Sequence, residues 1–282
     1  MLKKLTPDWQ NWIIENLQRG CTPESLLEPM QKNHFSLSDA QQHIEHIRAE
    51  LANAPAATVD DSVAYIYEPS RILSGNNIIL KDKVVTVSTR IAQPDIVVFE
   101  NFLSPEECET LIERSREKLR RSTVIDPESG EKHIIDNRSS DGCFFKLNED
   151  PFIQTLDERI AELMNWPLEH GEGIQILRYP VGAEYRPHFD YFPPEHPGSA
   201  KHMAKGGQRV ATLVMYLNNV PSGGETQFPS IHLSVTPRQG SATYFAYLNS
   251  HGQVDPATLH AGTPVLAGEK WIATKWMRQF PY

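Results

Sequence analysis

Apolar residues recur at the spacing of helical turns in the first fifty positions, and three polar start signals divide them. Thr6 and Thr22 each precede a proline and an acid, and Ser38 opens a capping box, all of which are typical helix starts. The apolar stripes behind these signals are Trp9, Trp12, Ile13 and Leu17, then Leu26, Leu27 and Met30, then Ala40, Ile44, Ile47 and Leu51. The pattern predicts a small module of three short helices, followed by an alanine-rich linker at residues 52–57.

Beyond the linker, apolar residues gather in short runs bounded by glycine, proline and polar residues. These runs predict strands over residues 84–87, 96–99, 174–179, 210–217, 241–247 and 271–276. A second capping box at Ser104 predicts a helix through Leu119, and another helix is predicted from Pro151 to Asn165. Residues 124–140 are polar and lack a period, which predicts a long loop. Many short strands separated by turns are typical of an antiparallel sandwich or jelly roll.

Composition and charge narrow the range of functions. The chain has 282 residues, 39% of them hydrophobic, which is enough for two packed domains. Its net charge of −9 repels phosphate backbones and disfavours nucleic acid as a partner. The sequence contains no long apolar run and no secretory signal, so no contact with a membrane is predicted. Three widely spaced cysteines favour a reducing compartment, and we expect a cytoplasmic protein.

His188 and Asp190 are the first candidates for chemistry. Strand side chains alternate between faces, so both groups point the same way. An imidazole and a carboxylate on one face are two of the three ligands of a non-haem iron(II) facial triad, although a surface ion pair would have the same spacing. His260, in the segment 255–262, is the best candidate for the third ligand.

Lys270 is a second, independent indication of chemistry. On the predicted strand it shares a face with Ile272, Thr274 and Trp276, whereas Lys275 points the other way and is expected to be an ordinary surface charge. A lysine directed into a barrel requires an anion, because an unpaired buried ammonium is very costly. A diacid cosubstrate with one carboxylate on iron and the other on Lys270 would provide that anion.

Several blocks of the sequence resemble the prolyl 4-hydroxylase family. They are residues 178–182, 185–192, 207–212, 215–217, 223–226, 255–260, 270–271 and 274–276, with a similar domain entry at 101–108. The blocks keep the family's order and spacing, which is far more specific than one motif, and the N-terminal helices lie outside them. The resemblance implies a double-stranded β-helix (jelly-roll) catalytic domain over residues 65–282. An all-α accessory module with its linker then occupies residues 1–58.

The resemblance also implies roles for named residues. The implied iron(II) ligands are His188, Asp190 and His260. The implied ligands of 2-oxoglutarate are Lys270, Tyr179 and Thr226, and the implied lining of the substrate groove is Tyr185, Arg209 and Trp276. Residues 124–140, with Arg138-Ser139-Ser140, correspond to the family's mobile lid over the peptide. At Gly142-Cys143-Phe144, members of the family more often have Gly-Thr and an aromatic residue. This departure concerns the implied lid contacts and does not affect the implied iron site.

The implied reaction is hydroxylation of a proline in a peptide or protein to 4-hydroxyproline. It couples the reduction of O2 to the decarboxylation of 2-oxoglutarate to succinate and CO2. Three protein ligands on an octahedral ion leave positions for 2-oxoglutarate and for O2. L-Ascorbate (vitamin C) is implied as the reductant that restores oxidised iron.

Three other readings fit parts of the pattern. A zinc hydrolase would not need Lys270 in the cavity, and a silent peptide-binding relative would be expected to have lost a ligand or that lysine. The same oxygenase chemistry could instead act on another amino acid or a small molecule. The sequence leaves open the substrate, the hydroxylated position and the oligomeric state. Partner binding, substrate selection and dimerisation fit the helical module equally well.

Overall fold

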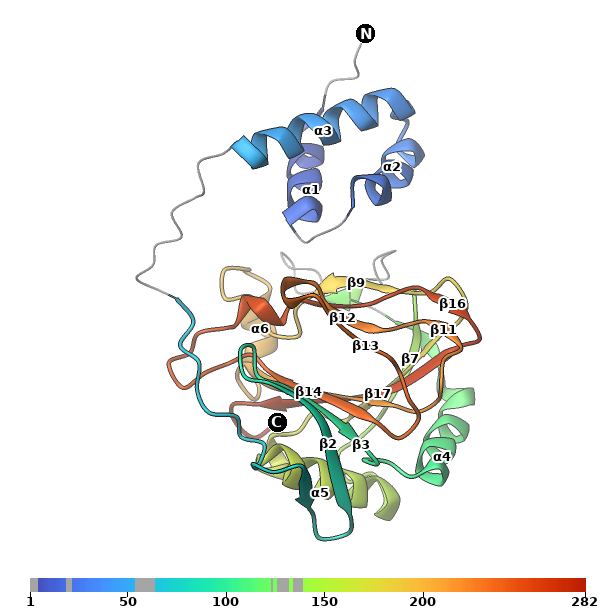
Figure 1. Ribbon diagram of the computed structural model, residues 1–282, viewed down its shortest axis with the longest axis vertical. Coiled ribbons are helices and arrows are strands. Elements are labelled where there is room, and N and C mark those ends of the chain that lie inside the picture. Colours follow the sequence, from blue (N-terminus) through green and yellow to red (C-terminus); the bar gives the residue numbers. More distant parts are fainter. Residues whose placement is uncertain (1–4, 19–21, 54–63, 123, 126–131, 134–138) are drawn as a thin grey trace. The chain divides into compact units, whose positions relative to one another are not determined.

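The computed structural model describes residues 5–18, 22–53, 64–122, 124–125, 132–133 and 139–282 (Figure 1). Contacts between residues divide the chain into two compact units, Met1–Ala64 and Tyr65–Tyr282. Each unit buries hydrophobic residues of its own. The predicted linker overlaps the last N-terminal helix at residues 52–53, and the rest of it lies outside the described residues.

The first unit contains three helices, as its apolar stripes predict: α1 (Pro7–Gln18), α2 (Pro23–Lys32) and α3 (Leu37–Asn53). Ile13, Met30 and Ile44 are buried between them. The predicted start of the third helix at Ser38 is wrong. The hydroxyl of Ser36 accepts a hydrogen bond of 3.0 Å from the backbone N–H of Asp39, so the helix is capped two residues earlier.

The second unit is built on a nine-stranded antiparallel sheet in the order β1-β2-β3-β14-β10-β17-β8-β7-β4. Its strands are β1 (Asn77–Ile79), β2 (Val84–Ile91), β3 (Ile96–Glu100), β4 (Arg120–Arg121), β7 (Asp141–Phe145), β8 (Ile174–Tyr179), β10 (Arg209–Tyr216), β14 (Ala242–Ala246) and β17 (Lys270–Arg278). Strand β17 is buried along its whole length. Ala273 and Met277 pack in one hydrophobic cluster and Ile272 in another, so both faces of this central strand are covered.

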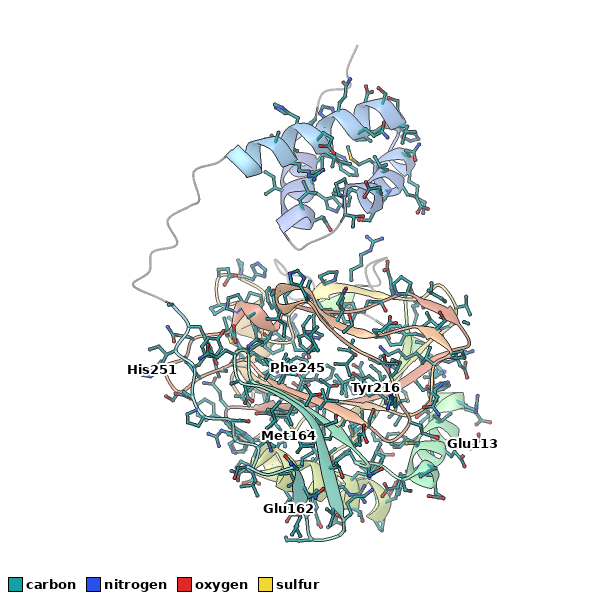
Figure 2. All side chains as sticks on the ribbon, in the orientation of Figure 1. Glu113, Glu162, Met164, Tyr216, Phe245 and His251 are labelled. Carbon is teal, nitrogen blue, oxygen red and sulfur yellow. The ribbon has the colours of Figure 1, made fainter. Side chains whose placement is uncertain are left out.

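A smaller sheet in the order β13-β12-β15-β9 lies across from the large one (Figure 1). Its strands are β9 (Tyr185–His188), β12 (Thr226–Phe228), β13 (Leu233–Val235) and β15 (His260–Gly262), and β11 (Ser222–Gly223) pairs with β16 (Val265–Ala267) at one end. Tyr216 and Phe245 of the large sheet (Figure 2) share a hydrophobic cluster with Phe228 of the small one. Two facing antiparallel sheets form the predicted jelly roll.

Helices α4 (Pro105–Ser115) and α5 (Pro151–Met164) lie on the outer side of the large sheet (Figure 1). The predicted capping box is present, because Ser104 and Glu107 exchange side-chain-to-backbone hydrogen bonds. Helix α4 ends before the predicted Leu119, since a 3-10 turn replaces it at Arg116. Among the described residues, no helix is long and apolar enough to cross a membrane.

The segment 124–140 is not wholly the loop that the sequence predicts. Strand β5 (Val124–Ile125) pairs with β6 (Lys132–His133), in keeping with the β-branched residues of β5. The remaining residues up to 138, including Arg138 of the predicted lid, lie outside the described residues. The ends of the segment meet, because the Ser122 N–H donates to the Ser140 carbonyl at 3.0 Å. Of the predicted lid, only residues 124–125, 132–133 and 139–140 are therefore among the described residues.

Candidate active site

Three potential metal ligands meet where strands β9 and β15 pair. The register of this antiparallel ladder places His260 opposite His188, and Asp190 follows His188 two residues later. One ring nitrogen of each histidine and one carboxylate oxygen lie within 4.8 Å of one another. Within the described ranges, no second group of three histidine, cysteine, aspartate or glutamate side chains comes so close. The structure therefore brings together the three residues that the sequence singled out.

Backbone carbonyls fix the orientation of both imidazoles. Nδ1 of His188 lies 2.8 Å from the carbonyl oxygen of Arg186, and Nδ1 of His260 lies 3.0 Å from that of Thr258. Because a carbonyl only accepts hydrogen bonds, each Nδ1 carries a proton, so in the neutral ring the lone pair lies on Nε2. The Nε2 atoms of His188 and His260 lie 3.8 and 3.6 Å from oxygens of Asp190. Two neutral imidazoles and a carboxylate suit a divalent iron ion.

Asp190 is held from the large sheet. The hydroxyl of Thr212 on β10 donates a 2.7 Å hydrogen bond to Asp190 Oδ2, and the Tyr247 hydroxyl lies 3.1 Å behind it. Burial opposes ionisation of Asp190, but the rings of His260 and His188 when protonated, the Arg209 guanidinium and the Thr212 hydrogen bond together lower its pKa below the usual value. The sequence analysis missed Thr212. A polar residue inside the otherwise apolar strand β10 was the signal that could have found it.

Lys270 lies in the wall of the same pocket. Lys270, Ile272, Thr274 and Trp276 line the pocket with the three potential ligands, which agrees with the predicted strand face. Only 3% of Lys270 is exposed, and its ammonium lies 5.6 Å from the ring centre of Tyr179. Burial lowers the pKa of Lys270 to about 8, although the negative charge of Glu225 opposes this shift. In the described part of the chain, no carboxylate forms an ion pair with this ammonium.

The expectation that Lys275 is a surface charge is wrong. Its side chain is 1% exposed, and its ammonium lies 2.6 Å from a carboxylate oxygen of Asp157 on α5. Strand alternation predicts correctly that Lys275 faces away from the pocket, but it carries no information on what covers the other face. Here helix α5 covers that face and supplies the partner charge.

Thr226 and Tyr179 both line the pocket beside Lys270. The hydroxyl of Tyr216 donates a 2.9 Å hydrogen bond to Thr226 Oγ1, which leaves the Thr226 hydroxyl proton available for another acceptor. In the sheet register, Tyr179 of β8 lies directly opposite Lys270 of β17. The residues expected at the far end of the cosubstrate are thus neighbours in the fold.

Tyr185 and Trp276 line the pocket with the ligand cluster, whereas Arg209, also predicted in the substrate groove, is not among its lining residues and lies behind Trp276. The ring of Tyr185 stacks on His188 with centroids 3.4 Å apart, and the Arg209 guanidinium lies 3.9 Å from the Trp276 ring centre. Arg209 donates two hydrogen bonds to Glu172, at 2.7 and 3.1 Å, and one of 3.2 Å to the backbone carbonyl of Asp190. Sequence reasoning missed Glu172, because nothing in the sequence marks which of 36 acidic residues pairs with a buried arginine.

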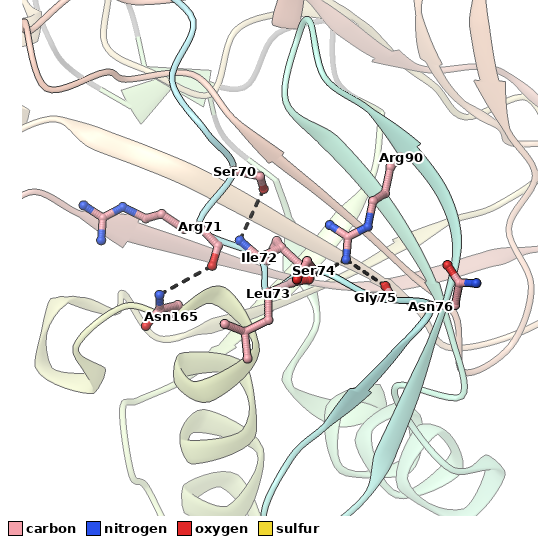
Figure 3. Close-up of a pocket in the computed structure, with 9 residues that line it drawn as sticks. All are labelled: Ser70, Arg71, Ile72, Leu73, Ser74, Gly75, Asn76, Arg90 and Asn165. Carbon is pink, nitrogen blue, oxygen red and sulfur yellow. Dashed lines mark hydrogen bonds between the residues drawn. The ribbon is translucent and has the colours of Figure 1, made fainter.

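A second cavity, of about 720 Å³, lies at residues 70–76 beside Arg90 and Asn165 (Figure 3). Arg90 donates to the backbone carbonyls of Leu73 and Gly75, and Arg71 stacks on the ring of Trp166. No histidine, cysteine or carboxylate of the described residues lines it, so it lacks the ligands that an iron ion needs. Its arginines also already bind groups within the fold.

Comparison with known proteins agrees with the geometry. Residues 174–278 match the 2OG-Fe(II) oxygenase superfamily. The chain is 40% identical over 209 residues to probable prolyl 4-hydroxylase 3 of Arabidopsis thaliana (67% of this chain, 71% of that protein). It is 43% identical over 201 residues to prolyl 4-hydroxylase 1 of the same plant (66% and 69%). Viral collagen prolyl hydroxylase from Paramecium bursaria Chlorella virus-1, solved as its 2OG complex, aligns with a TM-score of 0.51 and 29% identity (65% of this chain, 95% of that chain).

The jelly roll and the superfamily match define this protein as a 2-oxoglutarate- and iron(II)-dependent dioxygenase. The chain is more than 30% identical to both Arabidopsis proteins over at least two thirds of their lengths, which identifies its family within this superfamily. The chain belongs to the prolyl 4-hydroxylase family.

Proposed function

We propose that this protein hydroxylates proline in a peptide or protein, with iron(II) held by His188, Asp190 and His260 and with 2-oxoglutarate held by Lys270. The single observation that carries the proposal is the buried Lys270 ammonium in the pocket lined by the three ligand side chains. The Arabidopsis relatives, which are named prolyl 4-hydroxylases, support proline as the target residue.

The donor set fits iron(II). Both Nδ1 atoms face carbonyls, so the neutral rings present their Nε2 lone pairs to a metal, and Thr212 restricts the rotation of the Asp190 carboxylate. His188 and His260 lie on adjacent strands and Asp190 lies two residues beyond the end of β9, and all three line the pocket. Iron(II) and 2-oxoglutarate together supply the activation of O2 and the decarboxylation that yields succinate and CO2.

The pocket wall fits the distal carboxylate of 2-oxoglutarate. The Lys270 ammonium is desolvated, so an anion there gains an attraction that water screens only weakly. The proton of Thr226 is available to the same carboxylate, and Tyr179 offers a phenol from the neighbouring strand. These three residues orient the keto acid with its other end at the metal.

The mouth of the site fits a peptide that contains proline. Trp276 lines the pocket, and its buried indole N–H has no hydrogen-bond partner among the described residues. An unmet donor of this kind is costly, and a substrate acceptor satisfies it. Tyr185 and Trp276 add flat rings against which a pyrrolidine ring packs, and Arg209 backs the Trp276 ring.

The finer parts of the proposal rest on the sequence. The family resemblance supports L-ascorbate as the proposed reductant and a proline-containing peptide or protein as the proposed partner, and the three widely spaced cysteines support the cytoplasm as the proposed location. Residues 1–58 are the proposed accessory module, and residues 65–282 the proposed catalytic domain, a division that agrees with their separate hydrophobic clusters.

Incubation with iron(II), 2-oxoglutarate, ascorbate, O2 and a panel of proline-containing peptides tests the proposal. Mass spectrometry is expected to detect succinate and a peptide heavier by one oxygen atom on proline. His188→Ala, Asp190→Ala and His260→Ala are each expected to abolish both products. Oxygen on another residue would redirect the proposal to a different substrate, and full turnover without His260 would refute the ligand set.

A further inference from the structure

The turn that leads into His260 is locked by a buried carboxylate. Asp255 is 1% exposed, and its Oδ1 accepts the N–H of Ala257 at 2.9 Å. Its backbone carbonyl accepts both the N–H and the hydroxyl of Thr258, at 3.2 and 2.7 Å. The carbonyl of Thr258 in turn faces His260 Nδ1 at 3.0 Å. A short series of hydrogen bonds therefore joins Asp255 to the imidazole.

A segment from the start of the catalytic unit braces the same turn. In residues 65–68, here called the strap, the N–H of Ile66 donates to Gln253 Oε1 at 3.0 Å and its carbonyl accepts from Asn249 Nδ2 at 3.0 Å. Ser250 donates its N–H and its hydroxyl to the carboxylate of Glu68. These bonds cross more than 180 positions of sequence and hold residues 249–253, just before Asp255.

The strap also approaches the carboxylate itself. Burial and, after it, the Asp255 carboxylate raise the pKa of Tyr67, so the phenol and the carboxylate are neighbours. The same two side chains are hydrogen-bonded, which opposes the rise that burial causes in the pKa of Asp255. Tyr67 therefore ties the strap to the carboxylate that fixes the turn.

We infer that Asp255 is a positioning residue for His260, and that the strap completes the brace that presents this imidazole to the metal. The inference rests on the proposed role of His260 as an iron ligand. Asp255 does not touch the metal position. It acts by fixing the turn whose Thr258 carbonyl sets the tilt and the tautomer of the ring.

Anaerobic titration of the full-length protein with iron(II) tests the inference without turnover. Asp255→Ala removes the Oδ1 acceptor, so its dissociation constant for iron(II) is expected to rise about 10- to 100-fold, the usual effect of groups that orient a metal ligand. Asp255→Asn keeps an oxygen that can accept the Ala257 N–H and is expected to restore most of the affinity. Asp150→Ala removes an aspartate that caps helix α5 in the same way, and it is expected to lower the melting temperature without changing iron affinity.

The strap has its own matched pair of variants. Ile66→Pro removes the N–H that reaches Gln253, whereas Ile66→Ala keeps it and loses only a side chain that is 50% exposed. Ile66→Pro is expected to weaken iron binding in the same direction as Asp255→Ala, and Ile66→Ala to bind as the parent does.

The outcomes separate this inference from the proposed function. A parent protein that binds no iron(II) refutes the proposed metal site and, with it, the positioning role. A parent that binds iron(II), with unchanged affinity in Asp255→Ala and in Ile66→Pro, refutes the positioning role alone. Equal losses in Asp255→Ala and Asp150→Ala would show a general loss of stability and refute it also. If Asp255→Ala does not fold, the comparison of Ile66→Pro with Ile66→Ala tests the inference alone. Equal iron(II) affinities in these two variants would refute it.

Discussion

Lys270 and Lys275 project from opposite faces of strand β17 and are both buried, but among the described residues only the Lys275 ammonium pairs with a carboxylate. The ammonium of Lys275 lies 2.6 Å from Asp157, and both side chains are almost wholly enclosed. Lys270 faces the pocket, where no carboxylate of the described residues forms an ion pair with it. One lysine is therefore paired within the fold, and the other faces the pocket in which we propose that 2-oxoglutarate binds.

Lys270→Ala is expected to weaken 2-oxoglutarate binding by roughly a hundred- to a few-thousand-fold. Truncating one member of a buried ion pair costs about 3–5 kcal/mol, and about 1.4 kcal/mol corresponds to a factor of ten. Lys270→Arg is not expected to restore affinity, because the planar guanidinium is bulkier than an ammonium. Anaerobic calorimetry on the iron-loaded protein measures the effect. Lys118→Ala, at a lysine whose side chain is 48% exposed, is the control, and parent-like affinity in Lys270→Ala would contradict the prediction.

The affinity for 2-oxoglutarate is expected to fall as the pH rises above about 8. The pKa of Lys270 in the ligand-free fold is about 8, so above this value a proton must be taken up before the carboxylate is bound. The loss approaches about tenfold per pH unit. The Thr263 hydrogen bond lowers the pKa of Glu225, and burial raises that of Tyr216, so neither of these neighbours changes charge in this window. Dissociation constants measured from pH 7 to 9.5 check the slope, and a flat profile would exclude Lys270 as the titrating partner.

The same pKa shift affects the stability of the ligand-free fold. The folded pKa of Lys270 lies below its ordinary value of 10.5, so the unfolded chain binds this proton more tightly. The unfavourable contribution of the buried ammonium is therefore full below pH 8 and is relieved as the pH rises to 10.5. Urea denaturation of the parent and of Lys270→Ala across this range is expected to show a difference that shrinks with rising pH.

Lys275→Ala is expected to lower the free energy of unfolding by about 3–5 kcal/mol, because it leaves the Asp157 carboxylate buried without its partner. A double variant, Lys275→Met with Asp157→Asn, is expected to recover most of the loss, since replacing both members of a buried pair is often neutral. Urea denaturation followed by circular dichroism measures both. A loss below about 1 kcal/mol, the size typical of an exposed pair, would mean that water reaches the ion pair.

Thr212→Val is expected to weaken iron(II) binding by about 10- to 100-fold while preserving the shape of the side chain. The hydroxyl that it removes donates to Asp190 Oδ2 and keeps that carboxylate turned toward the two imidazoles. Thr243→Val is the matched control, because Thr243 is equally buried on a neighbouring strand but bonds Tyr216 instead of a proposed ligand. Iron titrations that did not separate the two variants would show that Thr212 has no special role.

Removal of residues 1–58 is expected to leave a protein that binds iron(II) and 2-oxoglutarate, because every proposed ligand lies in the second unit. The strap at residues 65–68 remains in this truncation. Iron titration and succinate release compare it with the full chain. A soluble truncation without iron affinity would show that the helices contribute to the metal site.

The sequence predicts well where the strands lie and to which face their side chains point, but it predicts poorly which side chains pair with one another. Strand β8 lies at the predicted residues 174–179, and the pocket face of β17 is correct, because both follow from local alternation. The environment of Lys275, the pairing of Arg209 with Glu172 and the hydrogen bond from Thr212 were not predicted. Each depends on a contact between segments distant in sequence, and a single sequence does not encode which of several chemically suitable groups will be adjacent.

The pairing of β9 with β15 also affects how the protein folds. In the unfolded chain His188 and Asp190 remain neighbours, but His260 approaches them only when the small sheet has formed. Such long-range pairing forms slowly during folding, because a long loop must close before any contact compensates for the lost chain entropy. With these proposed ligands, iron(II) is therefore expected to bind the completed ladder in preference to the open chain. Each tenfold excess of free iron(II) over its dissociation constant then adds about 1.4 kcal/mol to the stability of the fold. The abundance of the folded enzyme in iron-poor and iron-rich surroundings is consequently expected to differ even where no substrate is present.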